Sequence, residues 1–365
     1  MYSDADLQAA VAAGAMSPQD AQRFRDYMAT TAGTSAVDEE HFRLLTGFND
    51  IFVGIAAVIL LVAMAWIGNS MGGNIGNDGP SPFSGLLVAA TAWGLAEFFT
   101  RKRRMALPSI LLLLAFIGGV FTASAAGMVL AIGEATLQDN ERAGALIGSA
   151  AAAIAAVAAW LHWKRFRVPI TIAAGVAALV GVALGLIAYM VGSDNEATLR
   201  TVLLSFALLL GVGVFLFAMW WDSSDPKRLT RRSDVAFWLH LLAAPLIVHP
   251  IFSLLGLTDG TASVGEAVMV VLVYVIMGVT ALAIDRRALL VSALAYVLWA
   301  LTDLFERFGA VELSFALTAL VIGSALLLLS AFWHTARRAV VAPLPAGIQA
   351  RLPMTDRAVT PQPAS

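Results

Sequence analysis

Two histidines and two prolines lie within one apolar stretch of the sequence, DVAFWLHLLAAPLIVHPIFSLLGL. An imidazole can accept or release a proton, or hold a ligand, near neutral pH. Each proline removes a backbone hydrogen bond and crowds the preceding turn, so Pro245 and Pro250 predict a helix that kinks or breaks near its middle. Transporters build binding sites from such breaks inside the membrane. We therefore take His240, His249, Pro245 and Pro250 as a candidate intramembrane polar site.

The same four residues also have a purely structural interpretation. Each histidine could hydrogen-bond a neighbouring helix, and nine residues separate them, which points them in opposite directions on a straight helix. They can share one metal ion only if the helix bends. The chain has no cysteine and five histidines, and it contains neither an HExxH helix nor a GxSxG turn. The sequence predicts no metal, no cofactor, no catalytic residue and, on balance, no enzyme.

Two acidic residues near helix ends are weaker candidates for the same kind of site. Glu97 stands four residues before Arg101, and Asp303 stands four residues before Arg307. That spacing places each acid and its arginine on one helix face, where they can form an ion pair. Each acid is therefore either half of an interfacial ion pair or part of a polar pathway through the membrane.

Other acids have the spacing of helix caps. Asp50 and Asp234 stand at the start of apolar segments, where a negative charge suits the positive end of the helix dipole. The sequence from Ser263 to Glu266 has the S-x-x-E form of a capping box. These positions predict helix starts and not chemistry.

Composition shows what kind of element must position these residues. Of 365 residues, 59% are hydrophobic and 13% are charged, whereas a soluble domain carries about 25% charge. The formal net charge of −2 gives no basic field for nucleic acid. The sequence predicts an all-α, polytopic transmembrane helical bundle whose main partner is the lipid bilayer.

A helix that crosses a bilayer needs roughly 20 mainly apolar residues. Ten such runs are present, so we predict about ten spans. They are Asn49–Gly68, Pro82–Phe99, Leu107–Ile132, Ala143–Leu161, Val168–Val191, Thr201–Trp221, Val235–Leu257, Val264–Ala283, Ala288–Leu304 and Leu313–Trp333.

Clusters of basic residues occur in every second connection between these runs, and the other connections hold only Arg142, Arg200 and Arg307. The clusters lie at 101–104, 164–167, 227–232, 286–287 and 337–338. The positive-inside rule places such loops in the cytoplasm. Ten spans then leave both termini cytoplasmic, in a multi-pass membrane protein.

The segments outside the bundle differ from each other. Residues 1–47 predict a cytoplasmic helical hairpin, with a stop at Gly14 and a new helix capped by Ser17 and begun by Pro18. Residues 48–335 form the bundle, in which Gly181 and Gly185 allow close helix packing. Residues 336–365 contain five prolines and predict a partly disordered tail.

The hairpin VAAGAMSPQDAQRFRDYM, the segment DEEHFRLLTGFNDIFVGIAAVIL and the tail motif APLPAGIQARLPM carry a resemblance. Their arrangement resembles a group of uncharacterised bacterial polytopic inner-membrane proteins, a domain-of-unknown-function family. The resemblance implies a bacterial inner-membrane protein, and it brings no functional residues with it.

Two functions follow as alternatives. The kinked, histidine-bearing segment favours a permease or exporter for a weakly charged or lipophilic solute, because the spans contain almost no fixed charge. The scarcity of buried polar residues favours a non-transporting scaffold or regulatory protein that binds a protein partner through residues 1–47. The sequence gives no oligomeric state, substrate or coupling ion.

Overall fold

The fold of the chain is that of a computed structural model. The structure describes residues 7, 10–24, 48–76, 79–138, 140–192, 195–225, 230–255, 264–287, 289, 290, 294, 297, 298, 301, 302, 305, 313–349 and 352. The regular structure over these residues is helical. The all-α prediction is confirmed there.

The chain divides into two compact units, one formed by Met1–Arg43 with Asp356–Ser365, the other by Leu44–Thr355. In the first unit, Gly14 has φ +69° and ends a short helix. The Ser17 hydroxyl then accepts a 3.0 Å hydrogen bond from the Asp20 N–H, and a helix follows over residues 18–24. The predicted stop and cap are confirmed, because only a residue that tolerates positive φ can end the helix there.

Seven helices of the second unit are long and apolar enough to cross a membrane. They match the first seven predicted runs and contain 21 to 28 residues, or about 32–42 Å at 1.5 Å per residue. The helices are α3 (Phe48–Ser70), α4 (Pro82–Ala96) continued by the π-helix η1 (Glu97–Lys102), α5 (Ala106–Ile132), α7 (Glu141–Phe166), α8 (Ile170–Val191), α9 (Glu196–Ser223) and α10 (Arg231–Leu254).

The remaining helices leave the total number of spans as a prediction. Helix α11 (Val264–Ile284) matches the eighth run, and most of the ninth run, 288–304, lies outside the described residues. Helix α13 (Ser314–Ala331) covers the tenth run, but the chain then bends by 75° into α14 (Trp333–Val341). The predicted tail boundary at 336 falls inside α14, and the short α15 (Ala346–Gln349) follows it.

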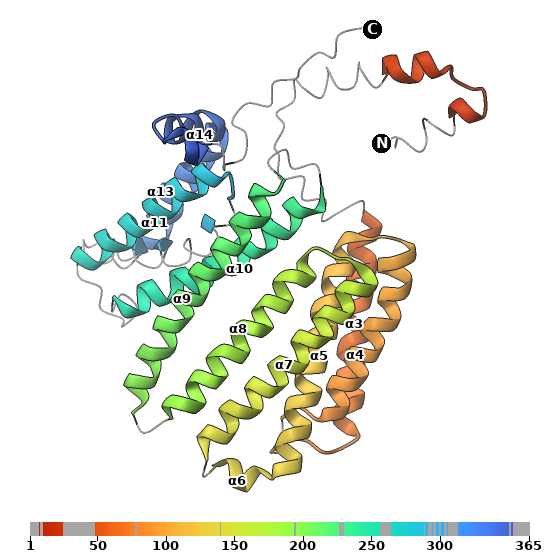
Figure 1. The fold of residues 1–365 in the computed structure, drawn as a ribbon, viewed down its shortest axis with the longest axis vertical. Coiled ribbons are helices and arrows are strands. Elements are labelled where there is room, and N and C mark those ends of the chain that lie inside the picture. The colour runs from red at the N-terminus through yellow and green to blue at the C-terminus, as the bar shows by residue number, and fades with distance from the viewer. Residues whose placement is uncertain are drawn as a thin grey trace. The chain divides into compact units, whose positions relative to one another are not determined.

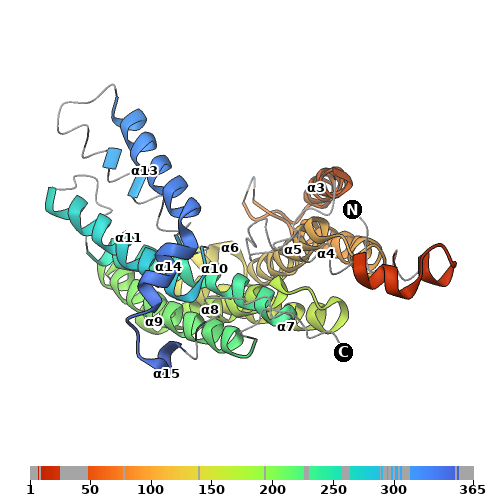
Figure 2. The ribbon, with the colours of Figure 1, turned by 90° about the horizontal axis from the view of Figure 1, so that it is seen from above.

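Consecutive helices pack against each other, and the closest pairs are α4 with α5, α7 with α8, and α9 with α10. Figures 1 and 2 show α3, α4 and α5 grouped together, with α7 to α10 following side by side. The short α6 (Glu134–Gln138) connects α5 to α7. Each of the three closest pairs is a hairpin whose turn carries a basic cluster, as the spacing of the clusters predicts.

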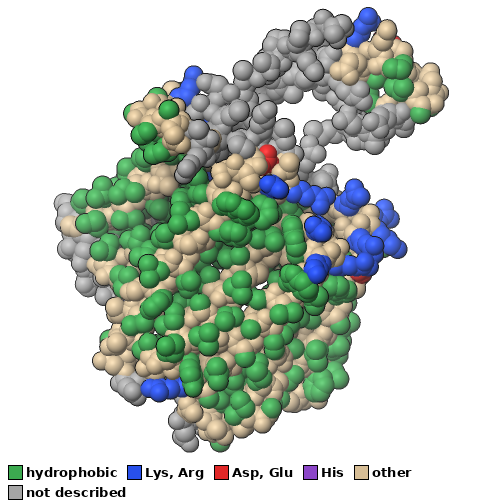
Figure 3. Space-filling view, in the orientation of Figure 1, with side chains coloured by type: hydrophobic (Ala, Val, Ile, Leu, Met, Phe, Trp, Pro, Cys, Tyr) green, Lys and Arg blue, Asp and Glu red, His purple; other side chains and the backbone are tan. Residues whose placement is uncertain are grey.

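Lysines and arginines gather mainly at one end of the face drawn in Figure 3, while the band below them is largely hydrophobic. Arg104 and Arg167 in two basic turns, and Asp285 after α11, have φ between 54° and 56°. They are the non-glycine residues with positive φ in the part of the chain that the structure describes. The basic turns therefore share a left-handed helix end.

Small residues set the distance between packed helices. A Cβ built on Gly185 of α8 would lie 2.9 Å from the Ser149 Cβ of α7, and one built on Gly181 would lie 3.4 Å from the Ala152 Cβ. The Ser149 hydroxyl donates a 3.0 Å hydrogen bond to the Val182 carbonyl across this contact. The predicted role of the GxxxG pair in packing is confirmed.

Helix α10 contains Pro245 and Pro250 but is continuous from Arg231 to Leu254. The expected break is therefore wrong. Pro250 frees the carbonyl of Leu246 four residues earlier, and a Cβ built on Gly211 of α9 would lie only 2.8 Å from that oxygen. The backbone of α9 therefore packs closely against α10 at this point.

Candidate functional site

A buried ionic cluster joins three helices at their basic ends. Asp222 in the last turn of α9 hydrogen-bonds His240 of α10, with 3.0 Å between Oδ2 and the imidazole Nε2. Arg286, which follows α11, donates from Nε to the same Oδ2 at 3.2 Å and from Nη2 to Oδ1. The Arg286 Nη2 also donates to the Ser233 carbonyl of α10 at 3.2 Å.

All three members of this cluster are excluded from solvent. His240 is 0% exposed, and Asp222 and Arg286 are 2% exposed. Phe215 covers the imidazole, with 5.3 Å between ring centroids. A buried carboxylate is stable only when it is paired and hydrogen-bonded, and here two oxygens accept from a guanidinium and an imidazole.

Local structure explains how distant residues meet at this point. Ser233 and His240 are seven residues apart and lie on one face of α10. After α11, the Asp285 N–H bonds the Leu282 carbonyl and the Arg286 N–H bonds the Ala281 carbonyl. These two bonds and the positive φ of Asp285 form a Schellman motif. The motif reverses the chain and turns Arg286 back toward α9 and α10.

A second polar contact begins at the neighbouring residue. The Asp285 Oδ1 accepts a 2.7 Å hydrogen bond from the Trp333 indole N–H and lies 3.7 Å from the Arg337 Nε. Arg337 is 2% exposed. The Arg287 guanidinium lies 4.8 Å from the centre of the Trp333 ring. Asp285 and Arg287 therefore hold the start of α14, while Arg286 binds α9 and α10.

The residues predicted as an intramembrane site separate in the structure. His240 is in the buried cluster, whereas His249 is exposed on the other side of the same continuous helix. Pro245 is exposed and Pro250 is buried. The structure does not bring the two histidines together, because nine residues of unbroken helix rotate them half a turn apart. Over the described residues, no three His, Asp or Glu side chains are arranged to hold a metal ion.

Of the two weaker candidates, Glu97 is described by the structure. Glu97 forms the expected ion pair with Arg101 at 3.3 Å. It also makes a two-pronged pair with Arg165 of α7, at 2.6 and 2.9 Å, which the sequence did not suggest. All three side chains are partly exposed. Asp303 lies outside the described residues.

The predicted positions of two acids in first helical turns are confirmed, but the residue that caps α10 is Thr230 and not Asp234. Asp50 and Asp234 lie in the first turns of α3 and α10. The Thr230 hydroxyl accepts from the Arg232 N–H at the start of α10. Ser263 and the side chain of Glu266 lie outside the described residues.

Sequence reasoning missed Asp222, Asp285, Arg286 and Arg337 as functional or structural centres. A signal existed for Asp222, because an acid in the last turn of a helix opposes the helix dipole and needs a cationic partner. Arg286 and Arg337 belong to basic clusters. We interpreted these clusters as signals of membrane topology, so we did not expect the two arginines to be buried. Whether a helix-end charge faces solvent or a neighbouring helix depends on packing, not on spacing.

A third buried polar site is a histidine that lies among aromatic rings. His162 of α7 is 0% exposed and its Nδ1 lies 3.2 Å from the Thr171 hydroxyl of α8. Phe166, Phe116 and Trp93 surround its ring, with centroids 4.5, 5.8 and 6.1 Å away. Among the residues with known placement, its Nε2 meets no hydrogen-bond partner. This cluster packs α4, α5, α7 and α8 together.

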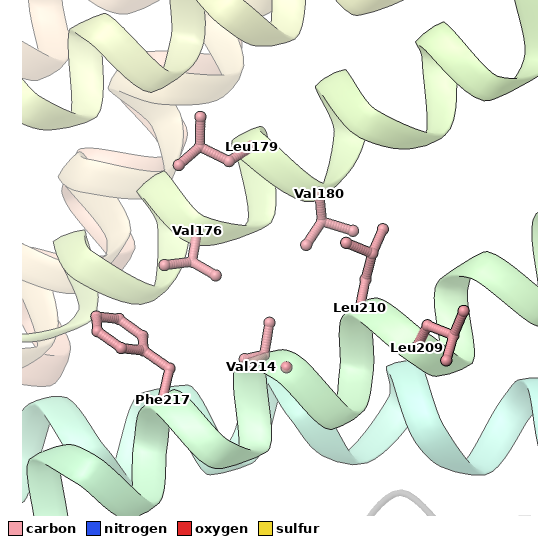
Figure 4. Close-up of a pocket in the computed structure, with 8 residues that line it drawn as sticks. Val176, Leu179, Val180, Leu209, Leu210, Val214 and Phe217 are labelled. Carbon is pink, nitrogen blue, oxygen red and sulfur yellow. The ribbon is translucent and has the colours of Figure 1, made fainter.

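A cavity of about 330 Å³ lies in the seam between α8 and α9. Figure 4 shows Val176, Leu179 and Val180 of α8 on one side and Leu210 and Phe217 of α9 on the other. Val214 and Gly213 of α9 also line it, and none of its described lining residues is charged. Leu179 and Leu209 at its edge are 58% and 65% exposed, so the cavity opens toward the outside of the bundle. We call it the α8–α9 groove.

Comparisons with known proteins find no match for this chain. No protein-family model matches the chain, and no curated protein sequence or solved structure matches it either.

Proposed function

We propose that this protein is a permease or exporter of a bacterial inner membrane for an uncharged, lipophilic solute. Its apolar helices make it a multi-pass membrane protein, and the resemblance to uncharacterised bacterial inner-membrane proteins supports the location. The observation that carries the proposal is the α8–α9 groove, which is lined by hydrocarbon and opens between two helices that can span the membrane.

The groove suits a solute that enters sideways from the lipid. Its lining offers dispersion contacts and no hydrogen-bond donor for a charged group. A volume of about 330 Å³ is within the range of small-molecule sites, roughly 300–1,000 Å³. The proposal therefore moves the site from the prolines of α10 to the seam between α8 and α9.

The buried cluster contributes by fixing one wall of this groove. Helix α9 supplies Phe217 and Val214 to the groove and Asp222 to the cluster. Gly211 holds the same helix against the α10 backbone. Helix α9 is thus anchored to α10 and to the end of α11, which makes the α8–α9 seam the place where the bundle can open.

Photocrosslinking tests the groove directly. We would reconstitute the full chain with phosphatidylcholine that carries a diazirine at the end of one acyl chain. Irradiation should label peptides that contain Val176, Val180 and Leu210. Gly213→Leu should fill the groove and remove this labelling, whereas Gly118→Leu on the exposed face of α5 should leave it unchanged. Equal labelling in the Gly213→Leu protein would contradict the proposed binding site.

Transport needs its own measurement. Inverted membrane vesicles would be energised and supplied with N-phenyl-1-naphthylamine, a neutral fluorescent lipophile. We expect protein-dependent movement of the probe that Gly213→Leu abolishes and Gly118→Leu does not. His249→Ala should leave it intact, because His249 does not line the groove. If the groove is labelled but the probe does not move across the membrane, the protein binds lipid and the transport proposal is refuted.

One observation favours the second candidate, a scaffold. Residues Met1–Arg43 belong to a compact unit separate from the helical bundle, in which Leu7 and Ala21 are buried. A small separate unit suits a docking module for a protein partner. Deletion of residues 1–43 should then remove a co-purifying protein while α8–α9 crosslinking persists; an unchanged set of co-purifying proteins would count against this role.

A further inference from the structure

Two basic turns lie next to each other at one end of the helical bundle. One joins η1 to α5, and the other joins α7 to α8. Glu97 links them, because its carboxylate contacts Arg101 of η1 at 3.3 Å and Arg165 of α7 at 2.6 and 2.9 Å. Figure 3 shows lysines and arginines gathered at one end of the face that it draws. We call residues 97–105 and 160–168 together the two-turn basic surface.

This surface has a large excess of positive charge. It holds seven lysines and arginines and one acid, Glu97. Glu97 pairs with Arg101 and Arg165, and among the described residues the other five cations form no ion pair. All five are exposed, and they are Lys102, Arg103, Arg104, Lys164 and Arg167.

The nearest acids in the sequence do not cancel this excess. Asp50 lies in the first turn of α3 and is 3% exposed. The three acids at 38–40 precede α3 and lie outside the described residues. Even with these four acids counted, the lysines and arginines of the surface outnumber them and Glu97 together. The surface therefore favours an anionic ligand.

Aromatic rings accompany three of the five unpaired cations. The Lys164 Nζ lies 3.8 Å from the centre of the Trp160 ring, and the Arg103 Cζ lies 5.4 Å from the centre of the Phe98 ring. Arg167 makes a longer contact of 5.9 Å with a third ring. Trp160 and Phe98 are 53% and 43% exposed. Exposed aromatic rings at the ends of membrane helices favour the depth of the lipid headgroups, so these cations are expected at the level of the lipid phosphates.

Exposed hydrocarbon leads away from the cations along α7. Ile154, Val157 and Leu161 are 45%, 57% and 47% exposed. Their spacing of three and four residues places them on one helix face, and the same spacing continues to Lys164. A ligand on this face meets hydrocarbon along a helix that can span the membrane and positive charge at its end. A phospholipid offers groups to both parts, whereas a free anion would use only the second.

From these observations we propose that the two-turn basic surface binds an anionic phospholipid. The lipid phosphate lies among the exposed cations of the two turns, and an acyl chain follows the apolar face of α7. Glu97 is the positioning residue, because it holds the two turns together through Arg101 and Arg165. The surface is separate from the α8–α9 groove and does not depend on its function.

A lipid titration tests the surface. The full-length protein in dodecylmaltoside micelles would be titrated with dioleoylphosphatidylglycerol, and bound lipids would be counted by native mass spectrometry. Dioleoylphosphatidylcholine has the same chains and no net charge. We expect the first phosphatidylglycerol to bind at least tenfold more tightly than the first phosphatidylcholine.

Removal of the three cations that contact rings should abolish this preference. Arg103→Gln/Lys164→Gln/Arg167→Gln, the charge-loss variant, should weaken phosphatidylglycerol binding about tenfold or more and leave phosphatidylcholine binding unchanged. Arg103→Lys/Lys164→Arg/Arg167→Lys, the charge-retaining variant, should keep most of the affinity. Both variants should melt like the native protein, because the three side chains are exposed.

A matched control removes the same number of charges elsewhere. Arg231→Gln/Arg232→Gln/Arg338→Gln changes exposed positions of α10 and α14 and should leave the Kd for phosphatidylglycerol within about twofold of the native value. The two α10 arginines have Asp225 and Asp234 close by in the sequence, so their turn has no comparable excess of charge. Inorganic phosphate at matched ionic strength should not displace the lipid.

Four results would each overturn the proposal. The first is equal binding of phosphatidylglycerol and phosphatidylcholine, and the second is an equal loss in the charge-loss variant and the matched control. The third is a loss in the charge-retaining variant as large as that in the charge-loss variant. The fourth is displacement by inorganic phosphate, which would assign the surface to a soluble anion. Diazirine labelling of the α8–α9 groove should be the same in all these variants, so the two proposals fail separately.

Discussion

At the scale of single residues, charge at helix ends has two roles in this protein. Glu97 and Arg165 form a partly exposed ion pair between η1 and the last turn of α7. Asp222 and Arg286 have similar sequence positions, at the ends of apolar runs, yet they are buried and carry hydrogen bonds between helices. Burial makes the second kind of pair sensitive to the loss of one partner, because the remaining charge cannot reach water.

Asp222→Asn should destabilise the protein strongly. It removes the negative charge that Arg286 and His240 contact and leaves a guanidinium buried, for which a loss of about 3–5 kcal/mol is typical. Thermal unfolding of the detergent-solubilised protein, followed by tryptophan fluorescence, should show a large fall in Tm. Glu97→Gln is the matched control, and its Tm should change much less because solvent screens that pair.

The double variant Asp222→Asn/Arg286→Met should recover part of this loss. Neither partner then leaves a buried charge, so the combined change should be smaller than the sum of the two single changes. Additive losses would show that the two residues act independently, against the direct pairing seen in the structure.

At the scale of elements, glycine positions decide which helices touch and which separate. Gly211 and Gly213 are two residues apart on α9, so they face different directions. A Cβ on Gly211 would meet the Leu246 carbonyl of α10 at 2.8 Å, whereas one on Gly213 would meet no described atom within 4 Å. One side of α9 is therefore closely packed and the other borders the α8–α9 groove.

Gly211→Ala should separate α9 from α10 and destabilise the protein. Overpacking of this kind costs about 1–3 kcal/mol, and here the obstacle is backbone, which cannot rotate away. Gly213→Ala should be neutral or slightly stabilising, since alanine favours helix over glycine. Melting curves of the two variants compare the same chemical change on opposite faces of one helix.

The pair Gly119 and Gly118 on α5 repeats this comparison. A Cβ on Gly119 would lie 2.7 Å from the Gly85 carbonyl oxygen of α4, and one on Gly118 would meet no described atom within 4 Å. Gly119→Ala should therefore lower Tm more than Gly118→Ala. Equal effects in both pairs would show that helix propensity, and not helix contact, controls stability.

At the scale of the whole molecule, the basic turns predict which side of the membrane each loop faces. Three of the five clusters lie in the turns of the closest helix pairs, and arginines and lysines gather largely at one end of the face in Figure 3. The positive-inside rule then places that end in the cytoplasm.

Single-cysteine labelling tests this orientation, and the chain has no cysteine of its own. Ser70→Cys and Asn140→Cys, in the connections without basic clusters, should react with a membrane-impermeant maleimide added to intact spheroplasts. Arg103→Cys and Ser224→Cys, in basic turns, should react only after lysis. The reverse pattern would contradict the assigned orientation.

One further cysteine position tests the number of spans. With ten spans, the ninth run at 288–304 crosses the membrane and Arg307 faces outward. Arg307→Cys should then be labelled in intact spheroplasts, like Ser70→Cys. Labelling only after lysis would remove the ninth run from the set of spans and would change the predicted side of the helices that follow it.

Much of the fold was predictable, since its causes are local. Apolar runs and their lengths predicted the seven long helices between Phe48 and Leu254, Gly14 and Ser17 predicted a helix end and a helix start, and Gly181 and Gly185 predicted close packing. The expected break in α10 did not occur, and the effect of a proline depends on the helix packed against it. Here the neighbouring Gly211 packs against the freed Leu246 carbonyl, and no property of α10 alone reveals that.

The sequence by itself determined that this is a helical membrane protein and predicted where its charges concentrate, because composition, run length and charge spacing act over neighbouring residues. The tertiary structure alone decided which of those charges meet. Asp222 and His240 are 18 residues apart, and Asp222 and Arg286 are 64 apart. Their meeting depends on a left-handed turn after α11 and on the contact between α9 and α10. The same packing decided that the α8–α9 groove exists, since a groove is a property of the space between helices.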